Sequence, residues 1–182
     1  MTPFFVGEIF MANFKVYTDG SCLGNPGAGG YAAIIIDENG NREEISGGES
    51  FTTNNRMELS AAIFALKKIP VSSQDELTTD SSYLKNAFTQ NWLTNWKKRG
   101  WISAGGGAVK NQDLWLQLDE LISARQVNFQ WVKGHAGNSY NERCDELART
   151  LAKKFQSAPQ NIQPKKSPPQ IDNRKWYQQE LF

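Results

Sequence analysis

The chain has 182 residues, a length typical of one domain with short extensions, and 39% of them are hydrophobic, enough for a sizeable core. Its net charge is only +1, so any nucleic-acid surface must come from a local arrangement of charge. No apolar run approaches the roughly 20 residues that span a bilayer, and two cysteines do not make a disulfide framework. The composition argues against a membrane or disulfide-rich protein and favours a cytoplasmic one.

Three antiparallel strands are predicted at the start of the chain. The first begins at Phe14 and ends at Asp19, where alternation directs the carboxylate away from the face that carries Val16. A turn rich in glycine follows, and the stretches Tyr31–Asp37 and Arg42–Glu49 give the second and third strands. Asp19 is thereby mounted at the end of a buried strand.

Helices and two further strands follow. Apolar residues at helical spacing, capping residues and Pro70 define the helices, and short alternating apolar runs define the strands. The predicted helices are 54–69, 82–89, 91–100, 111–124 and 140–155, and the strands are 76–79 and 127–132. This order predicts an α/β fold, with a mixed sheet of five strands and helices on both faces.

Composition divides the chain into three parts. Residues 1–12 are expected to be a loose arm that lacks the basic start of a secretory signal, with translation beginning at either Met1 or Met11. Residues 13–156 form the folded domain. Residues 157–182 are rich in Pro, Gln, Ser and Lys at first, and are expected to be a flexible tail.

Four acids occupy positions suited to chemistry. Asp19 and Asp80 follow predicted strands, whereas Glu58 and Asp145 lie near the starts of predicted helices. If these carboxylates converge they repel one another, and hard oxygen donors of this kind favour Mg²⁺ or Mn²⁺.

Each acid taken singly also has a structural interpretation. Glu58 could accept from backbone donors at its helix start, and Asp80 could be the N-cap of the helix 82–89. Asp145 could pair with Arg149 one helical turn later. The spacing from Ser139 to Glu142 fits a capping box, which leaves Asp145 free of that role.

His135 is the single histidine of the chain, and it lies between glycines in a loop after a strand. A histidine on such a loop favours a role in proton transfer or product release. No cluster of Cys and His accompanies it, which argues against a zinc site.

Long motifs in a fixed order resemble a known family. The segments YTDGSCLGNPGAGGYAAI, TTNNRMELSAAIFAL, TDSSYL, NWKKRGW and VKGHAGNSYNERCDELA resemble bacterial ribonuclease H of type 1, from about Phe14 to Leu151. The resemblance implies a ribonuclease H-like fold, with residues 13–156 as the catalytic domain of a monomer.

The resemblance also implies a reaction. Asp19, Glu58, Asp80 and Asp145 match the metal-binding acids of the family, and His135 matches its mobile histidine. The RNA strand of an RNA/DNA hybrid would be hydrolysed to 5′-phosphate and 3′-hydroxyl ends, largely independently of sequence. Two Mg²⁺ ions, replaceable by Mn²⁺, would take part, with Asp19 bridging both.

Substrate contacts follow from the same resemblance. Cys22, Asn25 and Asn55 match positions that read 2′-hydroxyls in the minor groove, with Thr53 and Asn54 near phosphates of the DNA strand. Capping of the helix is the alternative role for the two asparagines.

The stretch from Trp92 to Trp101 resembles the basic handle of the family, with Lys97, Lys98 and Arg99 as its cations. Trp92 and Trp115 are expected along the channel for the DNA strand, although tryptophans at this spacing also serve as core.

Three departures from the family are expected to change binding strength and leave the chemistry intact. Gly105–Gly107 replace lysines of the handle, Ser82 replaces a longer glutamine at a substrate-binding position, and Phe129 stands where tryptophan is frequent.

The last residues, Gln178-Gln179-Glu180-Leu181-Phe182, resemble the short peptide by which bacterial replication proteins bind the sliding clamp, with Gln178, Leu181 and Phe182 as its anchors. A chance aromatic end is the alternative.

The resemblance implies an enzyme that cleaves RNA/DNA hybrids and removes primers and R-loops. Two other classes of protein are alternatives to this interpretation. One is a binding module that has lost its chemistry, and the other is a DNA-cutting relative such as a transposase or junction resolvase. The four acids with His135 argue against the first, and the residues matched to 2′-hydroxyl reading argue against the second.

Overall fold

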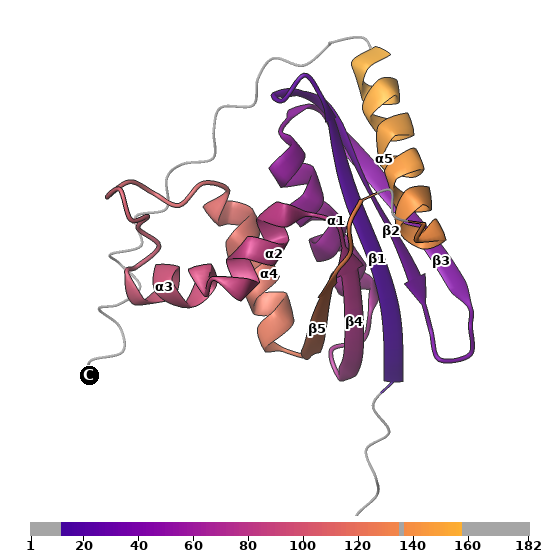
Figure 1. Ribbon diagram of the computed structural model, residues 1–182, viewed down its shortest axis with the longest axis horizontal. Helices are drawn as coiled ribbons and strands as arrows, with labels where there is room; N and C mark the ends of the chain where they lie inside the picture. The colour runs from indigo at the N-terminus through magenta and orange to yellow at the C-terminus, as the bar shows by residue number, and fades with distance from the viewer. Residues whose placement is uncertain (1–11, 135–136, 158–182) are drawn as a thin grey trace, which may run out of the picture.

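The computed structural model describes residues 12–134 and 137–157, which form one sheet and the helices on its two faces (Figure 1). The strands are β1 (Ala12–Leu23), β2 (Gly27–Ile36), β3 (Arg42–Thr52), β4 (Ser73–Thr79) and β5 (Gln126–Trp131). The helices are α1 (Asn54–Lys68), α2 (Ser82–Thr89), α3 (Trp92–Lys98), α4 (Gln112–Ser123) and α5 (Ser139–Ser157). Within these ranges no helix has the length and apolar character needed to cross a membrane.

The sheet has the strand order β3-β2-β1-β4-β5, which confirms the predicted mixed sheet. β1 pairs antiparallel with β2, and β2 with β3, as expected for strands joined by tight turns. β4 adds parallel to β1 through the crossover helix α1, and β5 adds parallel to β4. The central strand is therefore β1, which carries Asp19.

Two hydrophobic clusters lie on opposite faces of the sheet. The larger one joins the sheet to the helices α1 to α4, and its fully buried members include Leu59, Leu66, Leu77 and Trp115. The smaller one packs Cys144 and Ala148 of α5 against β2. Figure 1 shows α5 alone on its side of the sheet, with the other helices on the opposite side.

The first strand is longer than predicted, and Asp19 does not end it. The antiparallel pairing of β1 with β2 continues to the Leu23↔Ala28 pair. The pairing with β4 stops earlier, at Thr18↔Thr79. Asp19 is thus the first residue of β1 beyond the parallel ladder, where the sheet opens on that side.

A buried ion pair lies where the neighbouring strands β4 and β5 begin. Asp75 on β4 and Arg125 before β5 have side chains that are 0% and 2% exposed, with Arg125 Nε 3.8 Å from Asp75 Oδ2. Arg125 also donates to the carbonyl oxygens of Leu121 and Ile69, at the C-terminal ends of α4 and α1. One guanidinium therefore donates hydrogen bonds to two helix ends and places its positive charge beside a buried carboxylate.

Candidate active site

Asp19 and Glu58 come together because the backbones of β1 and α1 touch. A Cβ placed on Gly20 would overlap the main chain of Met57 and Glu58, so only glycine permits this approach. Asp19 is 8% exposed, and its carboxylate accepts from the Gly20 amide at 2.8 Å. The meeting of strand and helix thus fixes two acids.

Glu58 lies past the first turn of α1, not within it as expected. Its Oε1 accepts from the Asn54 side chain at 2.9 Å, and its Oε2 accepts from the Ser81 hydroxyl. The helix is capped by Thr53, whose hydroxyl accepts from the Arg56 amide. The capping role suggested for Glu58 is therefore wrong.

Asp80 follows β4 and faces α5. The Asn141 side chain on α5 donates to Asp80 Oδ2 at 3.1 Å, and the Trp131 indole donates to the Asp80 carbonyl oxygen at 3.1 Å. The N-cap of α2 is Ser81, which accepts from the Leu84 amide, so the capping role suggested for Asp80 is also wrong. Asp80 is left available for chemistry.

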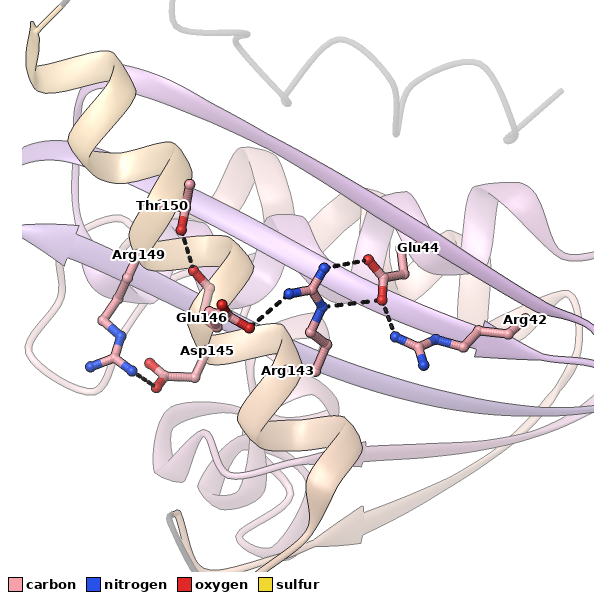
Figure 2. Close-up of polar contacts among 7 residues, drawn as sticks. All are labelled: Arg42, Glu44, Arg143, Asp145, Glu146, Arg149 and Thr150. Carbon is pink, nitrogen blue, oxygen red and sulfur yellow. Dashed lines mark hydrogen bonds and ion pairs between the residues drawn. The ribbon is translucent and has the colours of Figure 1, made fainter.

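Asp145 projects from α5 and forms an ion pair with Arg149, with Oδ2 and Nη2 2.5 Å apart (Figure 2). This pairing confirms the structural interpretation of Asp145, and it does not remove the residue from the site, as its charge acts on Asp19. The helix itself is anchored by Arg143, which binds Glu44 on β3 and Glu146 (Figure 2).

The start of α5 differs from the predicted capping box. Asn138 accepts from the Asn141 amide at 3.1 Å, in place of Ser139. Glu142 accepts from the Gly137 amide at 3.3 Å, so it does reach back over the helix start.

Burial and mutual repulsion raise the proton affinity of two of the acids. Burial, followed by the charges of Asp80, Asp145 and Glu58, raises the pKa of Asp19 to about 8, although the Gly20 amide opposes the shift. Burial and the charge of Asp80 raise the pKa of Glu58 to about 7, against the hydrogen bonds from Ser81 and Asn54. The four acids are therefore electrostatically one group, centred on Asp19.

The described carboxylates are not close enough together to coordinate one metal ion jointly. Among residues 12–134 and 137–157, no three side chains of His, Cys, Asp or Glu are gathered closely enough to hold an ion. Each acid contacts a protein partner instead: Gly20 for Asp19, Asn54 and Ser81 for Glu58, Asn141 for Asp80, and Arg149 for Asp145. The donor set consists of carboxylate oxygens, which suits a hard divalent cation and not a soft one.

His135 lies outside the described residues, and its predicted role stays a prediction. The preceding residue comes close to the acids: a Cβ on Gly134 would lie 2.8 Å from Asp80 Oδ2. The loop that carries the histidine therefore starts beside the carboxylates.

The residues expected to contact the minor groove of the substrate lie beside Asp19 and Glu58. Asn25 accepts from the Asn54 amide at 3.1 Å, which ties the β1–β2 turn to the start of α1. The Cys22 thiol donates to the carbonyl oxygen of Thr52 at 3.4 Å, next to Thr53. Together with the exposed Asn55, these side chains make one polar surface near Asp19.

One of the three cations of the basic handle is neutralised by an ion pair. Lys97 pairs with Asp119 on α4 at 2.7 Å, a neutralisation that the local sequence did not suggest, since no acid lies near it in the chain. Lys98 and Arg99 are exposed, and Trp92 is half-buried against Tyr83 and Trp96. Ser82 is exposed at the start of α2.

Trp115 is the one expected substrate contact that the structure contradicts. Its side chain is 0% exposed, its indole donates to the Tyr83 hydroxyl at 2.9 Å, and its ring meets Trp96. The residue belongs to the core beneath the handle, as the alternative interpretation held.

Three residues that support the site were not singled out from the sequence. Asn141, Ser81 and Trp131 contact Asp80 or Glu58, but they come from three different elements. Asn141 carried a signal, because it lies four residues before Asp145 on α5 and so shares a helix face with it.

The fold and the carboxylate site together define a nuclease of the ribonuclease H-like class. The family model described as RNase H matches residues 11–153. The ribonuclease H of Aeromonas salmonicida is 51% identical over 142 residues, covering 78% of this chain and 91% of that protein. The ribonuclease H of an Escherichia coli strain is 53% identical over 138 residues, covering 76% and 88%.

Solved structures agree with these relatives. LC9-RNase H1, a type 1 RNase H with the type 2 active-site motif, superimposes with a TM-score of 0.72 and 33% identity, over 82% of this chain and 76% of that one. LC11-RNase H1, solved in complex with an RNA/DNA hybrid, shares the fold with a TM-score of 0.56 and 24% identity, over 78% of this chain and 97% of that one. The chain belongs to the ribonuclease H family, in its bacterial type 1 branch, and is a hydrolase.

Proposed function

We propose that this chain hydrolyses the RNA strand of RNA/DNA hybrids, leaving 5′-phosphate and 3′-hydroxyl ends with little dependence on sequence. The observation that carries the proposal is the electrostatic group of four acids, with Asp19 on β1, Glu58 on α1, Asp80 directly after β4 and Asp145 on α5. Family membership supports the choice of substrate.

The four acids fit a site for two Mg²⁺ ions, with Mn²⁺ as a substitute. Their donors are hard oxygens, and the raised pKa of Asp19 reflects burial and a repulsion that divalent cations would relieve. When bound, such ions activate an attacking water and stabilise the departing oxygen of a phosphodiester. Asn141, Asn54 and Ser81 orient the carboxylates of Asp80 and Glu58 for this purpose. His135 would move a proton or assist product release.

Selection of the RNA strand would come from the polar surface beside Asp19. Short polar groups such as Asn25 and Asn55, together with the Cys22 thiol and exposed backbone, are suited to 2′-hydroxyls in a shallow groove. Thr53 and Asn54 would contact phosphates of the DNA strand. Lys98, Arg99 and Trp92 would extend this contact along the handle, with Lys97 weakened by Asp119.

A cleavage assay tests substrate and metal together. Labelled RNA/DNA hybrid, duplex RNA and duplex DNA are each incubated with the protein in Mg²⁺ and in excess chelator. We expect cleavage of the hybrid RNA alone, and only with Mg²⁺. Cleavage of duplex DNA would favour a DNA-cutting relative, and tight hybrid binding without cleavage would favour a binding module.

The same activity would remove RNA primers and R-loops during DNA replication and repair. The protein would act as a monomer in the cytoplasm. The free thiols of Cys22 and Cys144 are consistent with a reducing compartment.

The C-terminal peptide, which lies outside the described residues, would bind the bacterial sliding clamp through Gln178, Leu181 and Phe182. Deletion of residues 178–182 is expected to abolish capture of the protein by an immobilised clamp, while hybrid cleavage in isolation is unchanged. Equal capture of the deleted and full-length chains would end this part of the proposal.

A further inference from the structure

The four acids differ in the charge of their partners. Asp19, Glu58 and Asp80 accept hydrogen bonds from neutral groups, namely a backbone amide, a side-chain amide with a hydroxyl, and the Asn141 amide. Asp145 contacts a full positive charge, the Arg149 guanidinium. Among the described residues, Arg149 is the one cation that pairs with any of the four acids.

The charged atoms of Asp145 and Arg149 lie close together, but the ion pair is weak because both side chains are partly exposed. The two residues are four apart on α5, so they lie on the same face of the helix, and their charged atoms are 2.5 Å apart. The Arg149 side chain is 54% exposed and that of Asp145 is 18% exposed. An ion pair of this exposure contributes little to stability, so a divalent cation can displace it.

We propose that Arg149 is a built-in competitor for the metal: it neutralises Asp145 in the metal-free protein and must be displaced before Asp145 can join a divalent cation. The inference rests on the proposed metal site at the four acids. It accounts for the observation that the Asp145 carboxylate is turned to Arg149 (Figure 2).

The proposed competition predicts the direction in which loss of the Arg149 charge changes metal affinity. A positive charge beside Asp145 lowers the affinity of the site for a cation, and it also removes one ligand until the pair opens. Neutralising Arg149 should therefore tighten metal binding to the free protein. A residue that served only the packing of α5 would not change metal affinity in this direction.

Arg143 provides a matched control on the same helix. It carries the same charge two residues from Asp145, but its guanidinium is held by Glu44 on β3 and by Glu146 (Figure 2). Loss of its charge changes the net charge of the protein equally, without freeing Asp145.

The experiment is calorimetric titration of Mg²⁺ into chelator-treated, full-length protein without nucleic acid. For Arg149→Gln we expect a Kd about threefold to tenfold lower than that of the wild type, while Arg149→Lys and Arg143→Gln stay within about twofold. Asp19→Asn identifies the site, because it should remove most of the binding. Thermal unfolding in chelator should be nearly equal for Arg149→Gln and the wild type.

The outcomes separate the inference from the proposed function. Equal Mg²⁺ affinity in Arg149→Gln and Arg143→Gln, or weaker binding in Arg149→Gln than in the wild type, would overturn the competition alone. Binding that Asp19→Asn leaves unchanged would overturn the metal site and the competition with it.

Discussion

Asp19→Asn is expected to lower the kcat for hybrid cleavage by at least about a thousandfold while making the metal-free protein more stable. The loss follows from removing the central ligand of the proposed metal site, whose ions would supply several kcal/mol of transition-state stabilisation. The gain follows from removing a buried acid that disfavours folding either by taking up a proton or by staying charged, since burial and three neighbouring acids raise the pKa of Asp19 to about 8. Asparagine has nearly the same shape and carries no charge.

The gain in stability should depend on pH in one direction. The folded protein holds the Asp19 proton up to about pH 8, whereas the unfolded chain releases it near its ordinary pKa of 3.8. Protonation therefore favours the folded state, and this contribution is fully present below the ordinary pKa and is lost as the pH rises to about 8. In chelator, the advantage of Asp19→Asn in the free energy of unfolding should grow by about 3 kcal/mol between pH 5.5 and pH 8, because each pH unit between the two pKa values is worth about 1.4 kcal/mol.

Urea unfolding at the two pH values measures this advantage, and Asp37→Asn is its control. Asp37 in the β2–β3 turn has a pKa lowered by hydrogen bonds from Asn41 and neighbouring amides, so that variant should gain no stability. Near-normal turnover of Asp19→Asn would refute the catalytic assignment. Lost turnover without added stability at pH 8 would refute the electrostatic account alone.

Arg125→Ala is expected to cost about 3–5 kcal/mol in the free energy of unfolding, more than any other single change discussed for the fold. The substitution leaves Asp75 charged, fully buried and without its ion-pair partner, and it removes donors from the carbonyl oxygens of Leu121 and Ile69. Chemical denaturation gives the value directly. Burial raises the pKa of Asp75 although the Ser73 hydroxyl and the charge of Arg125 oppose the shift, and the neutral Ser73 cannot replace the charge of the arginine.

The double variant Asp75→Leu with Arg125→Met separates the two causes. It removes both charges and keeps most of the buried volume, so it should be much less destabilised than Arg125→Ala. A double variant as unstable as the single one would show that the helix-end hydrogen bonds, and not the unpaired carboxylate, carry the cost.

The elements of the fold were predictable because their signals are local. The helical spacing from Asn54 and the stop at Pro70 gave α1 almost to the residue, and α2 was placed within its true bounds. The end of β1 was missed because the glycines after Asp19 indicate a turn when read alone. Its continuation to Leu23 depends on pairing with β2, which is a tertiary property.

The four acids were picked out in the sequence because long ordered motifs carry them, and their charges do act on one another in the structure, but their hydrogen-bond partners were not predicted. Trp131 and Asn141 reach Asp80 from β5 and α5, and Asp119 reaches Lys97 from α4, across distances in sequence that no local pattern reports. Trp115 was misplaced for the opposite reason. A tryptophan beside a basic segment is compatible with both a surface and a core, and only the packing around Tyr83 decides between them.

The helix α5 rests on backbone at Gly30, where any Cβ would overlap the carbonyl oxygen of Ala148 and the Leu151 side chain. Glycine has no side chain to shorten, so no substitution at this position brings β2 and α5 closer. Any larger residue at position 30 would push them apart. The separation between β2 and α5, the helix that carries Asp145, is thereby set by main-chain contact at this point. Evolutionary change in the electrostatics of the four acids should therefore come from the charged residues around them and not from a change in this separation.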